Sequence, residues 1–199
     1  MVPSLLEGWD RATMRVTREK AAENRERIVE TASRLFREKG FDGVGLDAIM
    51  KDAGLTHGGF YGHFASKEDL AAEAVVHALA KSAELQRRYT NIGDFVSNYL
   101  SESHYADRAN GCALAALGGD MARRGDGVRS AAASYVRTQL ERLAGLFRGT
   151  AAVRRRRAIA TLAGIVGALT LARVVEDPVL SDEILSTARH VFGSSRLAA

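Results

Sequence analysis

Cysteine and proline are scarce in this sequence. Cys112 is the only cysteine among 199 residues, and there are only 2 prolines. A single cysteine permits no intramolecular disulfide, which favours a reducing compartment. It also excludes a metal site built from four thiolates. The hydrophobic share of 46% and the charged share of 26% are those of a globular chain, which argues against a disordered or collagen-like protein.

Long hydrophobic runs are also lacking. The N-terminal residues have neither the cationic start nor the apolar stretch of a signal peptide. The longest apolar run, 158–172, is shorter than the roughly 20 residues that a membrane-spanning helix needs, so it predicts a buried core or interface helix. We therefore expect a soluble, cytoplasmic protein with no membrane partner.

Motifs of common enzymes and metal sites do not occur in the sequence. There is no GxSxG, HExxH or GxxxxGK pattern. The five histidines lack the close spacing of metal ligands, since even His57 and His63 are six positions apart. These absences predict a protein that is not an enzyme and that uses no cofactor or metal.

The formal net charge of +4 is weak evidence for a nucleic-acid partner. Between residues 14 and 70 the basic and acidic side chains balance. Any basic surface in this segment must therefore come from the placement of its charges and not from their number.

Apolar residues recur at helical spacing through most of the chain. Residues 1–16 show no such periodicity, so we expect a flexible N-terminal extension there. A helix is predicted from about residue 18 to Lys39, where Gly40 is a typical stop. No alternating strand pattern or hairpin dipeptide is present, and the predicted fold class is all-α with about nine helices.

Two short helices, 46–53 and 57–64, follow and are separated by a turn that begins at Gly54. This arrangement is typical of a helix-turn-helix. Thr56 is the predicted N-cap of the second helix, and Ser66 with Asp69 forms a capping box for the next helix. The later helices are predicted over 67–87, 92–103, 112–123, 128–149, 154–175 and 178–192.

Residues 25–70, RERIVETASRLFREKGFDGVGLDAIMKDAGLTHGGFYGHFASKEDL, resemble the DNA-binding domain of the TetR/AcrR family of transcriptional regulators. The resemblance rests on the order and spacing of Ile28, Ala32, Phe36, Gly40-Phe41, Ile49, Ala53-Gly54, Tyr61, Phe64 and Ser66-Lys67. It implies a three-helix helix-turn-helix domain over 17–66 and a ligand-binding and dimerisation domain over 67–199. Val44 and Gly45 stand where the family commonly has threonine or serine.

The resemblance also implies which residues meet DNA. It places His57, Gly58 and Gly59 nearest to base edges, whereas Tyr61, His63 and Lys67 would hold phosphates. The glycines of this segment support a close approach, because each costs about 1 kcal/mol relative to alanine inside a helix. A core position for Tyr61 and a solvated position for His63 are the structural alternatives.

In this family the last two long helices pair across a two-fold axis. We accordingly expect a homodimer through 154–175 and 178–192, which would bind a nearly palindromic operator. Small residues recur at four-residue spacing on the first of these helices and would allow another helix to approach closely. They are Ala160, Gly164, Ala168 and Ala172.

The family's C-terminal domain encloses a small-molecule site. Candidate ligand-binding residues are polar or aromatic side chains on otherwise apolar faces, namely Phe95, Tyr99, His104, Cys112, Met121, Tyr135, Gln139 and Phe147. Gln139 and His104 have an alternative interpretation as hydrogen-bonded core residues. Cys112 is either a small apolar residue or a sensor of oxidants or electrophiles.

The predicted function is a sequence-specific DNA-binding regulator, a repressor that a small-molecule inducer releases from its operator. An electrophilic or oxidising inducer is one candidate, through Cys112. The alternative function is a low-specificity architectural DNA-binding protein, which would show little preference for an operator.

Overall fold

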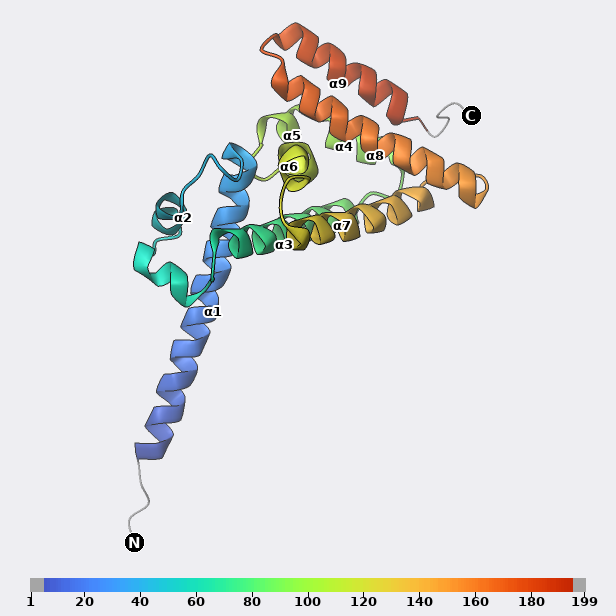
Figure 1. The fold of residues 1–199 in the computed structure, drawn as a ribbon. Coiled ribbons are helices and arrows are strands. Elements are labelled where there is room, and N and C mark those ends of the chain that lie inside the picture. Colours follow the sequence, from blue (N-terminus) through green and yellow to red (C-terminus); the bar gives the residue numbers. More distant parts are fainter. Residues whose placement is uncertain (1–5, 195–199) are drawn as a thin grey trace.

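The computed structural model describes the backbone of residues 6–194 and the side chains of residues 17–194. This part of the chain is all-helical (Figure 1). The elements are α1 (Leu6–Lys39), α2 (Leu46–Asp52), the 3-10 helix η1 (His57–Gly62), α3 (Lys67–Gln86), α4 (Ile92–Tyr99), α5 (Glu102–Ala106), α6 (Ala113–Met121), α7 (Asp126–Gly145), α8 (Ala151–Val174) and α9 (Pro178–Phe192). The predicted fold class is confirmed.

The first helix is longer than the sequence predicts. α1 begins at Leu6 and extends away from the rest of the molecule toward the N-terminus (Figure 1). The expectation of a non-helical extension over 1–16 is therefore wrong for residues 6–16, and residues 1–5 lie outside the described residues. Extending an existing helix by one residue costs far less than starting one, so a stretch without apolar periodicity can still continue α1.

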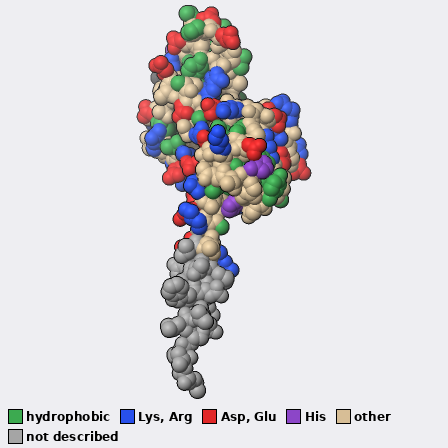
Figure 2. Space-filling model, turned by 90° about the vertical axis from the view of Figure 1, so that its left-hand side faces the viewer, with side chains coloured by type: hydrophobic (Ala, Val, Ile, Leu, Met, Phe, Trp, Pro, Cys, Tyr) green, Lys and Arg blue, Asp and Glu red, His purple; other side chains and the backbone are tan. Residues whose placement is uncertain are grey.

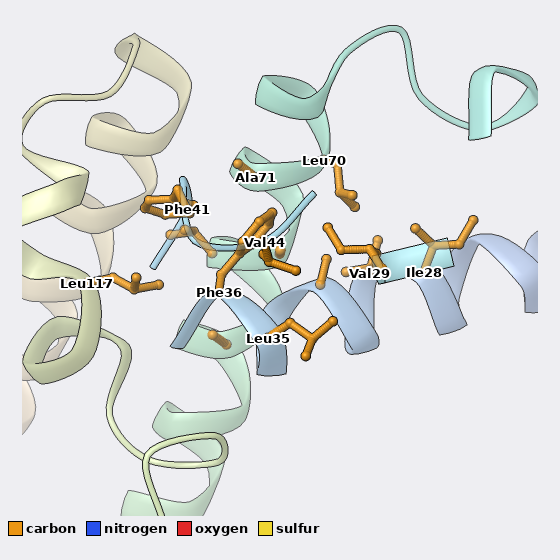
Figure 3. Packing of buried hydrophobic residues seen from close by; sticks show 14 of the residues in the cluster. Ile28, Val29, Leu35, Phe36, Phe41, Val44, Leu70, Ala71 and Leu117 are labelled. Atoms are coloured by element: carbon orange, nitrogen blue, oxygen red, sulfur yellow. The ribbon is translucent and has the colours of Figure 1, made fainter. Parts of the chain in front are cut away.

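The helix-turn-helix is α2 and η1, and it packs on α1 and α3. Apolar side chains from all four elements meet in one core, where Ile28, Phe36, Ile49 and Phe60 are at most 1% exposed. Figure 3 shows the part of this core in which Phe36 of α1 lies near Leu70 and Ala71 of α3. Gly54 opens the turn with φ of +69°, a conformation that glycine adopts without strain.

Two local predictions for this segment have different outcomes. The Ser66 hydroxyl accepts a hydrogen bond from the Asp69 amide at 3.1 Å, so the predicted cap of α3 is confirmed. Thr56 occupies the predicted N-cap position of η1, but its side chain makes no capping hydrogen bond, so the prediction is confirmed for the position only. η1 is a 3-10 helix and not the α-helix expected, because three of its six residues are glycine and glycine disfavours an α-helix.

The remaining helices form a second layer. α3 and α7 lie side by side, and α8 crosses α7 and pairs with α9 (Figure 1). α9 coincides with the predicted range 178–192, whereas the predicted 92–103 segment is interrupted at Leu100 and divides into α4 and α5. A second apolar core, containing Phe95, Ile165 and Leu169, lies between α4, α7, α8 and α9.

α8 is the one helix in the described residues that is long and apolar enough to cross a membrane by length and composition. It includes three residues ahead of the predicted range 154–175. Only 33% of its most apolar window is buried within this chain. Part of its apolar surface is therefore left uncovered by α7 and α9.

Candidate DNA-binding element and ligand cavity

Two neighbouring aromatic side chains of η1 differ in exposure, since Phe60 is buried and Tyr61 is exposed. Phe60 is fully buried and stacks on Phe64, with ring centroids 5.7 Å apart. Tyr61, the next residue after Phe60, is 66% exposed and meets the Phe60 ring edge-on. The core alternative for Tyr61 is therefore wrong, and its phenol is accessible to a partner outside the chain.

The glycines of η1 are not required by packing inside the molecule. A Cβ added at Gly58 or Gly62 would meet no atom within 4 Å, and neither residue has a positive φ. At Gly59 the nearest atoms would be 3.8 Å away, which is ordinary contact. The packing of the described residues therefore leaves space for a side chain at all three positions.

The other predicted DNA contacts surround Tyr61 at the surface. The His57 ring meets the Asp47 carboxylate, with Nδ1 2.5 Å from Oδ1, which orients the imidazole at the start of η1. His63 and Lys67 are partly exposed at the junction between η1 and α3. Basic and acidic side chains are interspersed over the face in Figure 2, as the balanced charge of the segment requires.

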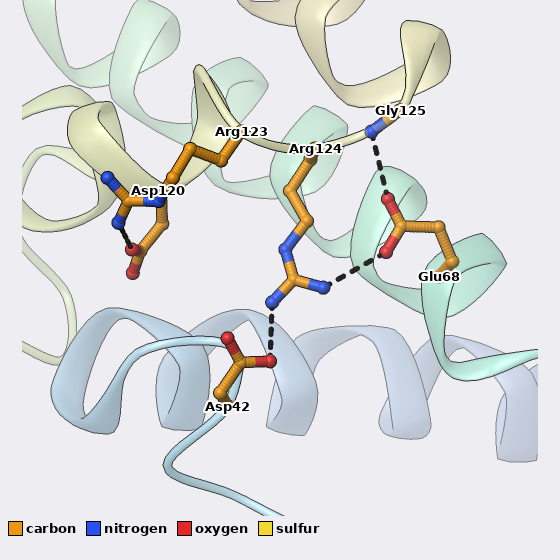
Figure 4. A network of polar contacts seen from close by, with 6 residues as sticks. All are labelled: Asp42, Glu68, Asp120, Arg123, Arg124 and Gly125. Atoms are coloured by element: carbon orange, nitrogen blue, oxygen red, sulfur yellow. Dashed lines mark hydrogen bonds and ion pairs between the residues drawn. The ribbon is translucent and has the colours of Figure 1, made fainter.

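Arg124 joins the helix-turn-helix to the second layer (Figure 4). Its guanidinium pairs with Asp42 at 2.7 Å and with Glu68 at 3.2 Å, and it lies 4.8 Å from the centroid of the Phe41 ring. The Gly125 amide donates to the other Glu68 oxygen at 3.3 Å. The hydrogen bond from Arg124 lowers the pKa of the Asp42 carboxyl below its ordinary value. Sequence reasoning missed this cluster, because its members are far apart in the chain.

A cavity of about 250 Å³ lies between the end of α3, α4, α5 and the loop 107–112. Four of the eight predicted ligand residues line it, namely Phe95, Tyr99, His104 and Cys112. Tyr89, Phe95 and Tyr99 form a continuous aromatic wall, with successive ring centroids 6.1 and 5.9 Å apart.

The other four predicted ligand residues do not line this cavity. Met121 and Phe147 are buried among apolar side chains of the two cores. Tyr135 and Gln139 lie one layer behind the wall, where the Tyr135 hydroxyl accepts from Gln86 at 3.4 Å and Gln139 accepts from Arg142 at 3.2 Å. Gln139 is 1% exposed, as its core alternative expects, but its amide nitrogen has no hydrogen-bond partner among the described residues, so that alternative is met only in part.

The Tyr99 hydroxyl lacks a hydrogen-bond partner among the described residues. Tyr99 is only 4% exposed, and burial raises the pKa of its phenol well above the ordinary value. A buried hydroxyl without a partner is costly. Because Tyr99 lines the cavity, a ligand group that accepts or donates a hydrogen bond would remove this cost.

His104 holds the loop that leads to Cys112. Its Nε2 accepts from the Cys112 amide at 2.9 Å, so Nδ1 carries the proton and donates to the Tyr99 carbonyl at 2.5 Å. Burial lowers the pKa of the imidazole below 6.5, which favours this neutral form. The imidazole ring thus lines the cavity and also makes two hydrogen bonds to the backbone, as the core alternative for His104 expects.

Cys112 is 3% exposed and occupies the N-cap position of α6. The sequence places only Arg108 near it, but the fold adds Arg37 and Arg173, whose guanidinium groups lie within electrostatic range of the sulfur. Arg173 is held beside the cavity by its hydrogen bonds to the His104 and Tyr105 carbonyls.

Exposed apolar side chains gather on α8 and α9. They are Ile159, Leu171, Val174, Val179, Leu180 and Val191. The predicted ridge of small residues does allow a close approach, because Gly164 packs so tightly on the Phe192 ring of α9 that no Cβ would fit. Ala172 is fully buried beneath Ser181 of α9, whose hydroxyl donates to the Ala172 carbonyl at 2.9 Å. Gly164 and Ala172 of the ridge thus contact α9 of the same chain, whereas Ala160 is exposed.

These features define an all-helical protein of the helix-turn-helix class, with an internal cavity in its second layer. The family described as "Bacterial regulatory proteins, tetR family" matches residues 28–74. Among curated relatives, the regulator AcrR of Shigella flexneri is 37% identical over 75 residues, which cover 38% of this chain and 35% of AcrR. LmrA of Bacillus subtilis is 35% identical over 85 residues, which cover 40% of this chain and 45% of LmrA. The matches therefore span less than half of these relatives.

Solved structures share the fold over most of the chain. A TetR-family regulator from Cytophaga hutchinsonii superposes with a TM-score of 0.71 at 21% identity, covering 86% of this chain and 94% of the other. A TetR regulator from Chloroflexus aurantiacus gives 0.70 at 25% identity, covering 86% and 95%. The reduced form of Escherichia coli NemR gives 0.67 at 21% identity, covering 84% and 96%. Residues 28–74 therefore match the tetR family of bacterial regulatory proteins, and the chain shares the fold of solved TetR-family regulators over most of its length.

Proposed function

We propose that this chain binds operator DNA as a homodimer and regulates transcription, and that a small molecule in the α3–α5 cavity weakens the binding. The observation that carries the proposal is η1, where an exposed Tyr61 and glycines with open space stand on a buried aromatic anchor. A helix-turn-helix places its second helix in the major groove.

The DNA contacts that we propose follow the surface of η1. His57, Gly58 and Gly59 lie nearest to base edges, and Tyr61 holds a phosphate. His63 and Lys67 hold the neighbouring phosphates, which fixes the position of the protein more than its sequence preference. The DNA-binding domain in this proposal covers residues 17–66, and the ligand and dimerisation domain covers 67–199.

The dimer that we propose forms through α8 and α9. The apolar side chains left exposed on these two helices, and the low buried share of the α8 window, support it. Each Å² of apolar surface that the dimer buries contributes about 25 cal/mol to the free energy of association. A two-fold axis through this face places two η1 segments on one side of the DNA, so the operator is nearly palindromic. We place this dimer in the cytoplasm.

The inducer in this proposal acts by differential affinity. A ligand that binds the released arrangement of the dimer more tightly than the DNA-bound one lowers operator affinity by that difference. Repression by operator occlusion is the mode that the family resemblance favours. An electrophilic or oxidising inducer is the finer form of the proposal, supported by Cys112 in the cavity wall and the arginines near its sulfur.

A binding titration at fixed salt tests the DNA-binding proposal. The full chain is titrated onto its own upstream intergenic DNA and onto a scrambled duplex, beside the Tyr61→Ala and Tyr61→Phe variants. We expect tight binding to the upstream DNA only, with a loss of about tenfold or more in Tyr61→Ala, since a phosphate contact and its ring surface are removed. An exposed variant on α7, Arg137→Gln, serves as the matched control.

Weak and equal binding to both duplexes would overturn operator recognition on this DNA and support the architectural alternative. If Tyr61→Ala bound the upstream DNA as tightly as the parent chain, the proposed contact between Tyr61 of η1 and DNA would be wrong. In either case circular dichroism of each variant establishes that the helices are intact.

A further inference from the structure

Arg37 is a buried cation that makes no direct ion pair among the described residues, although the Asp107 carboxylate lies within electrostatic range of it. It lies on α1 and is only 5% exposed, and its Nε donates to the Ala109 carbonyl at 2.7 Å. Within residues 17–194 its two terminal nitrogens have no hydrogen-bond acceptor, and no carboxylate lies within ion-pair distance. Buried charges in proteins are normally paired, because an unpaired charge is costly to remove from water. The terminal nitrogens of Arg37 therefore remain available for direct contact with an anion.

Arg37 lines a polar cleft of about 290 Å³ between the DNA-binding helices and the second layer. α1 contributes Arg34 and Arg37, three positions apart, and α3 contributes His77 and Lys81, four positions apart. These spacings place each pair on one face of its helix, and α1 packs directly on α3. The cleft thus receives basic side chains from two helices that lie side by side.

Two carboxylates also line the cleft, but each already has a cation. Asp52 pairs with Arg34, and Glu30 lies 3.8 Å from the Lys81 ammonium. These two pairs cancel in charge. Arg37 remains as the cation of the cleft that makes no direct ion pair with a carboxylate among the described residues.

We propose that this cleft binds the phosphate group of a small phosphorylated molecule. A planar guanidinium with two free terminal nitrogens grips an oxyanion in bidentate fashion. The other donors come from α3 and from Asn110 of the loop 107–112, so they approach from several directions. A tetrahedral anion with oxygens on all sides suits this arrangement better than a planar carboxylate. The cleft is larger than a phosphate group, which leaves room for a few more atoms of the ligand.

The site is separate from the ligand cavity but shares one residue with it. Asn110 lines both, and Arg37 is bonded to the same loop through Ala109. A bound phosphate would therefore bridge α1, α3 and the segment that leads to Cys112. This proposal does not depend on operator binding by the chain.

The test is calorimetric titration of the full chain with inorganic phosphate, against sodium chloride at the same ionic strength. We expect saturable binding of phosphate, weakened about tenfold or more by Arg37→Gln, since a hydrogen bond to a charged group is lost. Lys81→Gln tests the same site at a half-exposed position where folding is not at risk, and it should weaken binding several-fold. Arg137→Gln, with the same charge change on α7, should bind like the parent chain.

A further variant distinguishes phosphate binding in this cleft from phosphate binding at the proposed DNA-binding surface. Lys67→Gln should leave phosphate binding unchanged. The proposal is overturned if chloride reproduces the heat, if Lys81→Gln binds like the parent chain, or if Lys67→Gln alone abolishes binding. It is also overturned if Arg137→Gln loses as much affinity as Arg37→Gln, because the effect would then be one of net charge.

Discussion

Replacing Gly58 with alanine should change stability and DNA affinity in opposite directions. A Cβ at this position meets no atom within 4 Å, and φ is not positive, so the folded state accepts alanine without strain. The unfolded chain loses backbone freedom at the same time. The free energy of unfolding should therefore rise by about 0.4–1 kcal/mol, which corresponds to a shift of about 1–4 °C in the midpoint of thermal unfolding for a chain of this size.

Operator affinity should fall in the same variant. If η1 lies against base edges, the added methyl group occupies the space that the DNA needs, and we expect a loss of about tenfold, or about 1.4 kcal/mol. Gly118→Ala on α6 is the matched control, since its Cβ also meets nothing within 4 Å. That variant should gain stability and keep its affinity for DNA.

Urea unfolding at one fixed protein concentration and a DNA titration at one fixed salt concentration measure the two effects. A Gly58→Ala variant that is more stable and binds the operator as well as the parent chain would refute the argument that close approach explains the glycine. A less stable variant would refute the packing argument itself.

Two further predictions concern the cavity. Burial lowers the pKa of His104 in the folded state, so the unfolded chain takes up a proton at this residue first as the pH falls. The free energy of unfolding that neutral His104 contributes is therefore present above about pH 6.5 and is lost below it. In urea unfolding between about pH 8 and 5, His104→Gln should flatten this part of the pH dependence. A slope unchanged by the substitution would contradict this assignment. Cys112→Ala should keep operator affinity but abolish release by a maleimide, which in the parent chain adds once by mass spectrometry because no other cysteine exists. Release that persists in Cys112→Ala, or an adduct that causes no release, would rule out a sensor role for the thiol.

Local signals in the sequence were reliable where a single turn of helix decides the structure. The start of α9 follows from Pro178 at a first-turn position, and the Asp177 side chain caps it by accepting from the Val179 and Leu180 amides. The cap at Ser66 is equally local. In η1 the same local reasoning failed, because the glycines that suit a close approach also remove the preference for an α-helix.

Pairings between distant segments could not be derived from the pattern. The small residues of α8 indicate a close helix contact, but only the fold shows that Gly164 receives Phe192 of the same chain. Helical periodicity likewise identifies buried positions without distinguishing a cavity wall from a solid core. For this reason Tyr99 and Met121 looked equivalent in sequence, although only Tyr99 lines the cavity.

The Arg124 cluster bears on the exchange of domains between regulators. A chimera that replaces residues 17–66 with another family member's DNA-binding domain keeps Glu68 but removes Asp42 and Phe41. Arg124 then retains one carboxylate, and its guanidinium loses the aromatic ring on which it lies. A working transplant into this chain must therefore keep the acidic and aromatic residues of the α1–α2 loop, or change Arg124 to match the new loop.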